Sequence, residues 1–439
     1  MAGTSPAKTI EGGCRCGLRD ALSATVLQRA GDEMSETAEP SVLQPGRGSA
    51  GEVFLVALRL GLTSFGGPIA HLGYYERTYV RERRWLSPDE YAGLVALCQM
   101  VPGPASSQVG YLVGLRRAGW GGALAAWAGF TLPSAIVMFA FALLAPRLEG
   151  PTTDAVLHGL KLVAVAVVAQ AVWSMARNLC PDRARAALAL LAAALLLVAG
   201  GSFVQIAALL IGAIGGALLC RELPALPGLP AMPVTLRTGG VALALFLGLL
   251  VVLPLAGSAR PHSLLALAGI FYKAGALVFG GGHVVLPLLR DALVPQGWLS
   301  DGTFLAGYGV AQAIPGPLFT FSVYLGAIVA PAGAALAWSV VALVFIFLPG
   351  LLIALAGLPV WLWLGHHPIA RAALAGINAA VVGVLGAALY NPIWLSAVGG
   401  GRDVAIALAG FLLLERWRVP PLAIVIFCVG AAVVSALAP

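Results

Sequence analysis

The stretch Gly61-Leu-Thr-Ser-Phe-Gly-Gly67 decides the architecture of this chain, because it returns 214 residues later as Gly275-Ala-Leu-Val-Phe-Gly-Gly281. Other landmarks recur in the same order at nearly the same spacing: Trp85-Leu-Ser87 and Trp298-Leu-Ser300, Gln99-Met-Val-Pro-Gly-Pro104 and Gln312-Ala-Ile-Pro-Gly-Pro317, Tyr111 and Tyr324, Pro133 and Pro349, and Gly159 and Gly376. Chance does not easily produce so many ordered matches. The sequence therefore predicts an internal duplication.

The composition excludes a soluble globular protein. Hydrophobic residues make up 59% of the 439 positions and charged residues 10%, with a mean hydropathy of +0.92, whereas soluble domains carry about 25% charged residues. Apolar segments that predict membrane spans lie at 53–70, 92–115, 121–146, 154–176, 184–200, 203–220, 239–257, 264–287, 303–330, 332–357, 369–390, 402–415 and 420–437. The six cysteines are scattered, which favours free buried thiols.

The predicted fold is an all-α polytopic membrane protein with two homologous halves and about 12 to 13 transmembrane segments. We divide the chain into a disordered cytoplasmic tail at 1–51, an N-terminal domain at 52–220, a connector with one span at 221–263 and a C-terminal domain at 264–437. Seven predicted spans separate equivalent points of the two copies. An odd number turns the second copy upside down, which is the inverted-repeat arrangement of secondary transporters.

Loop charges do not fit simple crossings. Arginines precede the second segment at 77, 81, 83 and 84 and follow it at 116 and 117, so one crossing would put a basic cluster outside. Two explanations stay open: the positive-inside preference fails here, or the Pro-Gly-Pro segment is re-entrant.

The Pro-Gly-Pro motifs are the first candidate functional elements. Proline removes a backbone donor and clashes with the preceding turn, so a helix is expected to break at each motif. The helix that follows would present free N–H groups and its positive dipole end, which attract an anion. The predicted break residues are Pro102, Gly103, Pro104, Pro315, Gly316 and Pro317, and the hydroxyls on the following turns are Ser106, Ser107, Thr320 and Ser322. The alternative is a kinked packing helix whose hydroxyls bond to its own backbone.

Paired glycines and two cations form the second candidate set. Glycine pairs let a ligand approach bare N–H groups, although close helix packing explains them equally well; these glycines are Gly66, Gly67, Gly280 and Gly281. Arg59 and Lys273 occupy equivalent positions two residues before the repeated Gly-x-x-x-Phe-Gly-Gly motif. A cation within an apolar span is a functional candidate by default, and the alternative is that both reach to the membrane interface. His71 and His283 do not match in the repeat and are interpreted as packing or lid residues.

Other functions are disfavoured by what the sequence lacks. It contains no Gly-x-x-x-x-Gly-Lys-Ser/Thr phosphate loop, no His-Glu-x-x-His motif and no Gly-x-Ser-x-Gly motif. We therefore expect no enzyme activity, no cofactor and no metal site, and transport driven by an ion gradient or the membrane potential. An intramembrane enzyme or a structural protein is the distant alternative. Basic blocks with interleaved aromatics are also lacking, so no nucleic acid is expected as a partner.

Taken together, these motifs resemble the chromate ion transporter family over about residues 52–437. The resemblance is carried by Gly61 to His71, Arg83-Arg-Trp-Leu86, both Gln-x-x-Pro-Gly-Pro motifs, Phe279 to Pro287 and Gly376 to Gly383. It implies a long-chain, two-domain member that exports chromate from the cytoplasm across the inner membrane and confers chromate resistance. Sulfate or another oxyanion is the alternative substrate. The expected partners are chromate, the lipid bilayer and a second copy of the chain in a homodimer.

Overall fold

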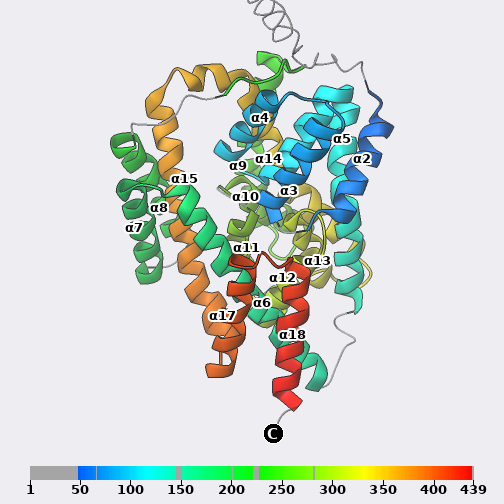
Figure 1. Cartoon of the computed structure of the whole chain (residues 1–439), viewed down its shortest axis with the longest axis vertical. Coiled ribbons are helices and arrows are strands. Elements are labelled where there is room, and N and C mark those ends of the chain that lie inside the picture. Colours follow the sequence, from blue (N-terminus) through cyan, green and yellow to red (C-terminus); the bar gives the residue numbers. More distant parts are fainter. Residues whose placement is uncertain are drawn as a thin grey trace, which may run out of the picture. The chain divides into compact units, whose positions relative to one another are not determined.

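The structure is a computed structural model that describes residues 48–65, 67–144, 151–199, 201–220, 227–279 and 282–437. Every element in these ranges is a helix (Figure 1). The predicted tail lies outside the described residues apart from its last four positions. By length and composition, five described helices can cross a membrane: Ala105–Leu144, Asp154–Leu179, Leu236–Ser258, Ala335–Trp361 and Pro368–Ala397. The chain is thus a multi-pass membrane protein, as predicted.

The two halves contain the same series of elements. The first half comprises α2 (Ala50–Thr63), α3 (Gly67–Tyr75), η1 (Glu76–Glu82), α4 (Pro88–Met100), α5 (Ala105–Leu144), α6 (Pro151–Leu179), α7 (Arg183–Ala199) and α8 (Gly201–Leu219). The connector contains α9 (Leu236–Ser258). The second half comprises α10 (Leu264–Ala276), η3 (Gly282–Val284), α11 (Val285–Leu293), α12 (Asp301–Ala313), η4 (Leu318–Thr320), α13 (Phe321–Ile328), α14 (Ala335–Gly365), α15 (Pro368–Ala388), η5 (Leu389–Trp394), α16 (Leu395–Ala397), α17 (Gly401–Glu415) and α18 (Pro421–Leu437).

Helix α5 is really two helices. Gly119 adopts φ +65° and interrupts the helical backbone, so a short first part is followed by a long second part that begins after Gly119. This division makes the first part of α5 the counterpart of η4 and α13, and the second part the counterpart of α14.

The first half opens with two helical hairpins whose ends meet. Glu52, in the first turn of α2, lies 3.1 Å from Arg117 and 3.6 Å from Arg83. Glu90, in the first turn of α4, lies 3.6 Å from Arg116. The start of α2, the end of η1, the start of α4 and the end of the first part of α5 therefore share one end of the molecule, which we call the arginine end.

The second half also opens with two helical hairpins, and the ends of these hairpins meet around Trp298. The rings of His262 and Trp298 stack 4.6 Å apart, and Trp298 lies 6.1 Å from Trp338. The Tyr324 hydroxyl donates to the Thr303 carbonyl at 3.0 Å. The start of α10, the end of α11, the start of α12 and the start of α14 thus meet at what we call the tryptophan end.

The hairpins correct the sequence prediction at four segments. The segments 53–70, 92–115, 264–287 and 303–330 were expected to cross the membrane, but each turns back at its glycine or Pro-Gly-Pro break. The two basic clusters around the second segment consequently lie at the same end, as the re-entrant explanation requires, so the positive-inside preference need not fail here. Seven predicted crossings separate equivalent points of the two halves, and two of these crossings are hairpins. Five crossings remain, which is still an odd number.

Equivalent helices run in opposite directions. Along the second part of α5, Gly121 lies beside Ala50 at the arginine end, Ser134 lies beside Gly316, and Phe141 stacks on Tyr324 near the tryptophan end. Along α14, Trp338 lies at the tryptophan end and Gly350 beside Gly103; Trp361 then donates to the Pro227 carbonyl, next to the start of α4. The two halves are therefore inverted repeats, as predicted.

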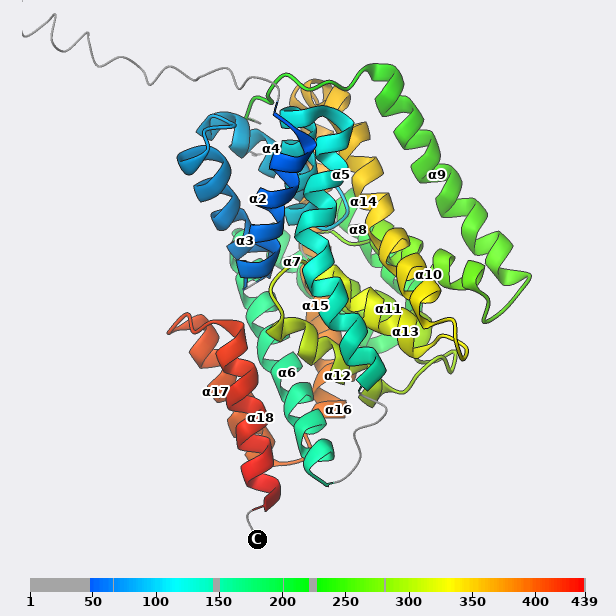
Figure 2. The ribbon, with the colours of Figure 1, turned by 90° about the vertical axis from the view of Figure 1, so that its right-hand side faces the viewer.

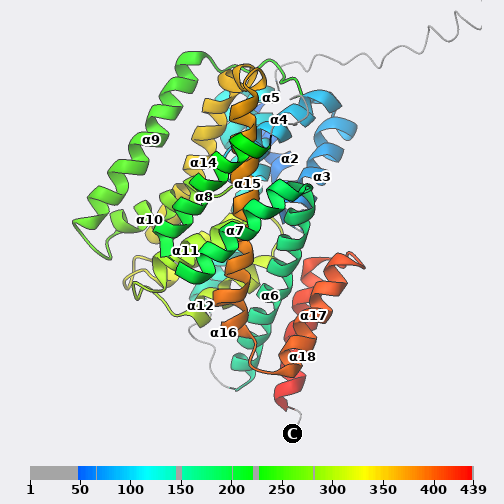
Figure 3. The ribbon, with the colours of Figure 1, turned by 90° about the vertical axis from the view of Figure 1, so that its left-hand side faces the viewer.

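The last two helices of each half pack on the other half. Helices α7 and α8 pack on α15 of the second half (Figure 3), and α17 and α18 pack on α6 of the first half (Figure 2). The repeated glycines Gly159 and Gly376 lie at these contacts. A Cβ at Gly376 would collide with the Gly212 carbonyl, and one at Gly159 would lie 2.6 Å from the Val429 Cα. Glycine is required there because the helix backbones approach closely.

Candidate functional site

The Pro-Gly-Pro segments form the tips of the second hairpin in each half. Helix α4 ends at Met100 and α5 begins at Ala105, while α12 ends at Ala313 and η4 begins at Leu318. Gly103 and Gly316 adopt φ values of +124° and +108°, which are open to glycine and strained for other residues. The flanking prolines stop one helix and allow the next to start.

Each tip is bonded to the other half of the chain. The Gly103 N–H donates to the Val278 carbonyl at 2.7 Å, and the Gly316 N–H donates to the Ser64 carbonyl at 3.0 Å. Ser64 and Val278 are equivalent residues, located just before the two glycine breaks. We call the region where these four residues meet the crossing, and it is the part of the described chain where all four hairpins come together.

The first turn of α5 presents hydrogen-bond donors at the crossing. Gln108 is the first residue whose N–H bonds within this helix, to the Pro104 carbonyl at 3.0 Å, so the preceding amides are free of intrahelical partners. Ser106 and Ser107 are buried. The Ser106 hydroxyl lies 3.4 Å from His71 Nδ1, and His71 Nε2 lies 3.2 Å from the Ser64 carbonyl. His71 therefore connects the start of α5 to the end of α2.

The corresponding turn in the second half is different. The Thr320 hydroxyl donates to the Pro317 carbonyl at 2.8 Å, so it forms a hydrogen bond with the backbone of its own turn. Ser322 is buried, and its hydroxyl has no hydrogen-bond partner within the described ranges. The residues on either side of Thr320 are Phe319 and Phe321, which pack against other aromatic rings.

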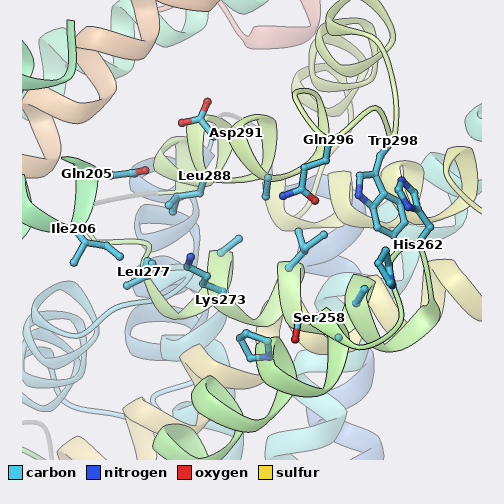
Figure 4. A pocket seen from close by; sticks show the side chains of 18 of the residues that line it. Gln205, Ile206, Ser258, His262, Lys273, Leu277, Leu288, Asp291, Gln296 and Trp298 are labelled. Carbon is cyan, nitrogen blue, oxygen red and sulfur yellow. The ribbon is translucent and has the colours of Figure 1, made fainter. Parts of the chain in front are cut away.

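The predicted cations lie away from these buried hydroxyls. Arg59 is exposed on α2. Lys273 is also exposed and lines a cavity of about 390 Å³ between α8, α9, α10 and α11. Figure 4 shows its amine facing the same space as Gln205 of α8, with Asp291 of α11 on a further wall. The structure holds both proline breaks at the crossing and buries the four hydroxyl residues, but it leaves the two cations exposed.

The predicted glycines are described only in part. Gly67 begins α3 with φ +79°, and a Cβ there would lie 3.8 Å from His283 Nε2. Gly66, Gly280 and Gly281 lie outside the described residues. His283, a residue of the second half, therefore lies near the glycine break of the first half. Its Nδ1 also contacts the Tyr308 hydroxyl at 2.7 Å.

Sequence reasoning missed several buried polar residues around the crossing: Ser64, Gln108, Thr131 and Ser134. Gln108 Nε2 donates to the carbonyls of Pro102 and Gly350, both at 2.8 Å, and so ties the first tip to α14. The Ser134 hydroxyl donates to the Thr131 carbonyl at 3.0 Å. A position-by-position comparison of the two copies would have found these residues, because they are polar where the other copy is mostly apolar.

Comparisons with known proteins agree with this architecture. The family model described as "Chromate transporter" matches residues 51–218 and again residues 265–434. The chain is 30% identical over 404 residues to a chromate transport protein of Pseudomonas aeruginosa, covering 89% of this chain and 91% of that protein. It is 27% identical over 343 residues to a chromate transport protein of Cupriavidus metallidurans, covering 76% and 80%. An uncharacterized transporter of Methanocaldococcus jannaschii is 26% identical over 391 residues, covering 88% and 92%. No solved structure matches the chain.

Inverted repeats with broken helices that meet in the interior are typical of membrane transport proteins. Two matches to one family model, together covering most of the chain, confirm the duplication predicted from the repeated motifs. The chain belongs to the chromate transporter family.

Proposed function

We propose that this protein exports chromate from the cytoplasm across the inner membrane and thereby confers chromate resistance. The names of the Pseudomonas and Cupriavidus relatives support chromate as the substrate. The observation that carries the proposal is the buried start of α5, where free amides and the hydroxyls of Ser106 and Ser107 face the crossing. Amide and hydroxyl donors at a helix N-terminus suit an anion that only accepts hydrogen bonds.

The direction follows from the charge of the substrate. One charge moved through 100 mV changes the free energy by about 2.3 kcal/mol, so a dianion that leaves an inside-negative cell gains about 4.6 kcal/mol per 100 mV. Export is electrically downhill and electrogenic. Uptake would need more than two coupled cations to become favourable, and the described acidic side chains lie mostly near the helix ends.

The orientation in the membrane follows from the arginines. Six of them gather at the arginine end: Arg77, Arg81, Arg83, Arg84, Arg116 and Arg117. The loops at the tryptophan end contribute Arg260, and α11 contributes Arg290. Cytoplasmic loops are enriched in arginine and lysine, so we place the arginine end in the cytoplasm and the tryptophan end outside.

The hairpins supply the two gates. Those of the first half reach the crossing from the cytoplasmic side, and those of the second half reach it from the outer side. Chromate enters when the first pair moves away and leaves when the second pair moves away, which is alternating access around one fixed region. Arg59 and Lys273, exposed one on each half, provide positive potential that draws the dianion towards the gates.

Sulfate transport is the second candidate, because amides and hydroxyls do not distinguish tetrahedral dianions of similar size. A homodimer remains a prediction.

The test uses the full-length protein in liposomes with chromate inside and a potassium gradient that sets the potential. We expect chromate efflux that accelerates when the inside is negative, carries net charge and slows with sulfate as a competitor. Flux that does not respond to the potential would overturn electrogenic export. Faster flux of sulfate than of chromate at equal concentration would favour the second candidate, and a lack of flux for both anions would overturn the proposed function.

A further inference from the structure

We infer that the oxyanion is held by the N-terminal half alone, in a polar cluster around the start of α5, while the C-terminal half presents an apolar wall. This inference rests on the proposed function and specifies its site. A duplicated chain with an approximate twofold axis would be expected to bind a dianion symmetrically, with one helix N-terminus from each half. The two halves differ too much in polarity for that arrangement.

Alignment of the two copies on their shared landmarks exposes the difference. The anchors are Gly61 with Gly275, Pro104 with Pro317, and Pro133 with Pro349. At six aligned positions the first copy is polar where the second is not: Ser64 and Val278, His71 and Val285, Ser106 and Phe319, Gln108 and Phe321, Thr131 and Phe347, and Ser134 and Gly350. Ser107 aligns with Thr320, and this pair is the one in the set that keeps a hydroxyl in both copies.

All seven residues of the first copy are buried, and contacts join most of them into a cluster. His71 contacts both Ser106 and the Ser64 carbonyl. Gly316 fits between the Ser64 carbonyl, which accepts its N–H, and Ser134, whose Oγ would lie 2.7 Å from a Cβ at that glycine. Ser134 is bonded in turn to the Thr131 carbonyl. We call these seven residues the polar cluster.

Three hydroxyls of the polar cluster have no partner. The side-chain oxygens of Ser64, Ser107 and Thr131 are buried and make no hydrogen bond within the described part of the chain. A buried polar atom without a partner destabilises the fold, so native proteins retain few of them without a functional reason. Together with the free amides at the start of α5, these hydroxyls offer a set of donors to a ligand that has only acceptors.

At the six aligned positions the C-terminal half offers no polar side chain to such a ligand. Among the described residues, its own unpartnered buried donors near the second break are the Ser322 hydroxyl, which aligns with Val109, and Gln312 Nε2. Phe319 packs 5.5 Å from Phe347, and Phe321 packs 5.1 Å from Phe304. The Thr320 hydroxyl already donates to the Pro317 carbonyl. These aromatic residues exclude water from one side of the crossing, which strengthens the hydrogen bonds that the polar cluster makes on the other side.

The test compares equivalent hydroxyls in the full chain reconstituted in liposomes, with sodium chromate as the probe. Hydrogen bonds to a charged ligand account for about a 10- to 100-fold change in affinity, so we expect Ser107→Ala to raise the KM for chromate by at least about tenfold. The increase in KM caused by Thr320→Ala should be smaller than the increase caused by Ser107→Ala by a factor of about five or more. Ser107→Thr, which introduces the residue of the second copy, should restore most of the affinity because it returns the hydroxyl.

The control is Ser339→Ala, which removes a buried hydroxyl that donates to the Val323 carbonyl at 2.9 Å, away from the crossing. It should leave KM unchanged, and thermal unfolding in detergent should show whether each variant remains folded. Equal increases in KM for Ser107→Ala and Thr320→Ala would overturn the one-sided site and leave the transport function intact. If the wild-type chain transports no chromate, the proposed function fails instead, and this inference fails with it.

Discussion

Gly103 donates its backbone N–H to the Val278 carbonyl at 2.7 Å, and the two residues belong to opposite halves of the chain. The equivalent bond from Gly316 to Ser64 makes the relationship reciprocal. Each hairpin tip is therefore bonded to a hairpin of the opposite half. In the proposed mechanism, these two bonds would have to change when either gate opens.

We expect that neither Gly103 nor Gly316, at the two Pro-Gly-Pro tips, can be replaced by a residue with a side chain. A Cβ would lie 2.7 Å from the Gly350 Cα at position 103 and 2.7 Å from Ser134 Oγ at position 316, and strained backbone conformations cost about 1–3 kcal/mol each. We expect Gly103→Ala and Gly316→Ala each to abolish chromate resistance and to lower the Tm measured in detergent. Gly119→Ala is the control, because Gly119 has φ +65° but no neighbour within 4 Å of its Cβ position. Full resistance in both tip variants would contradict the crossing.

The exchanged helices should be sensitive at Gly376. We expect Gly376→Leu to destabilise the protein by more than the ~1–3 kcal/mol typical of overpacking, because it forces apart the backbones of α15 and α8. The measurement is the amount of protein that reaches the membrane, together with its Tm. Gly386→Leu on the same helix is the matched control, since nothing lies within 4 Å of its Cβ position. Equal loss in both variants would indicate that leucine disturbs α15 itself rather than the contact between halves.

The cations should act through long-range attraction. Arg59 and Lys273 are exposed, so we expect the Arg59→Ala, Lys273→Ala double variant to raise KM about tenfold at low ionic strength with little change in maximal rate. Because salt screens exposed charges, the difference from wild type should shrink in 0.5 M potassium chloride. Flux measured at both salt concentrations tests this, with each single variant expected to lie between. A KM equal to wild type at low salt would remove both cations from the mechanism.

The two ends should be reached from opposite sides of the membrane. In a chain whose six cysteines are replaced by alanine, we expect Arg81→Cys to react with a membrane-impermeant maleimide only in inside-out vesicles. Gln296→Cys, in the exposed loop after α11, should react in intact cells. The Arg81 side chain is 73% exposed, so burial would not explain a lack of labelling. Labelling of both positions from one side would show that the ends do not face opposite compartments.

The duplication and the helix breaks could be predicted from the sequence, because each depends on local chemistry. Repeated landmarks such as Gly61 and Gly275 are visible in the letters alone, and two prolines around a glycine stop a helix in any context. The same reasoning placed Gly159 and Gly376 at equivalent points, and both proved to lie where helices of opposite halves touch.

The hairpins and the polar cluster required the structure. An apolar stretch such as 53–70 has the same hydropathy whether the chain continues across the membrane or turns back, and only contacts such as Glu52 with Arg83 distinguish the two. Arg59 and Lys273 occupy equivalent sequence positions, but the outer face of a helix and its inner face are equally apolar in a membrane protein. Their exposure therefore could not be derived from periodicity.

The exchange of terminal helices bears on how such a transporter is produced. Because α15 is covered by α7 and α8, and α6 by α17 and α18, each half completes the fold of the other. A cell that made the halves as separate polypeptides would have to synthesise them in equal amounts. Any surplus copy would carry an uncovered helix through the bilayer and be a target for the proteases that clear unassembled membrane subunits.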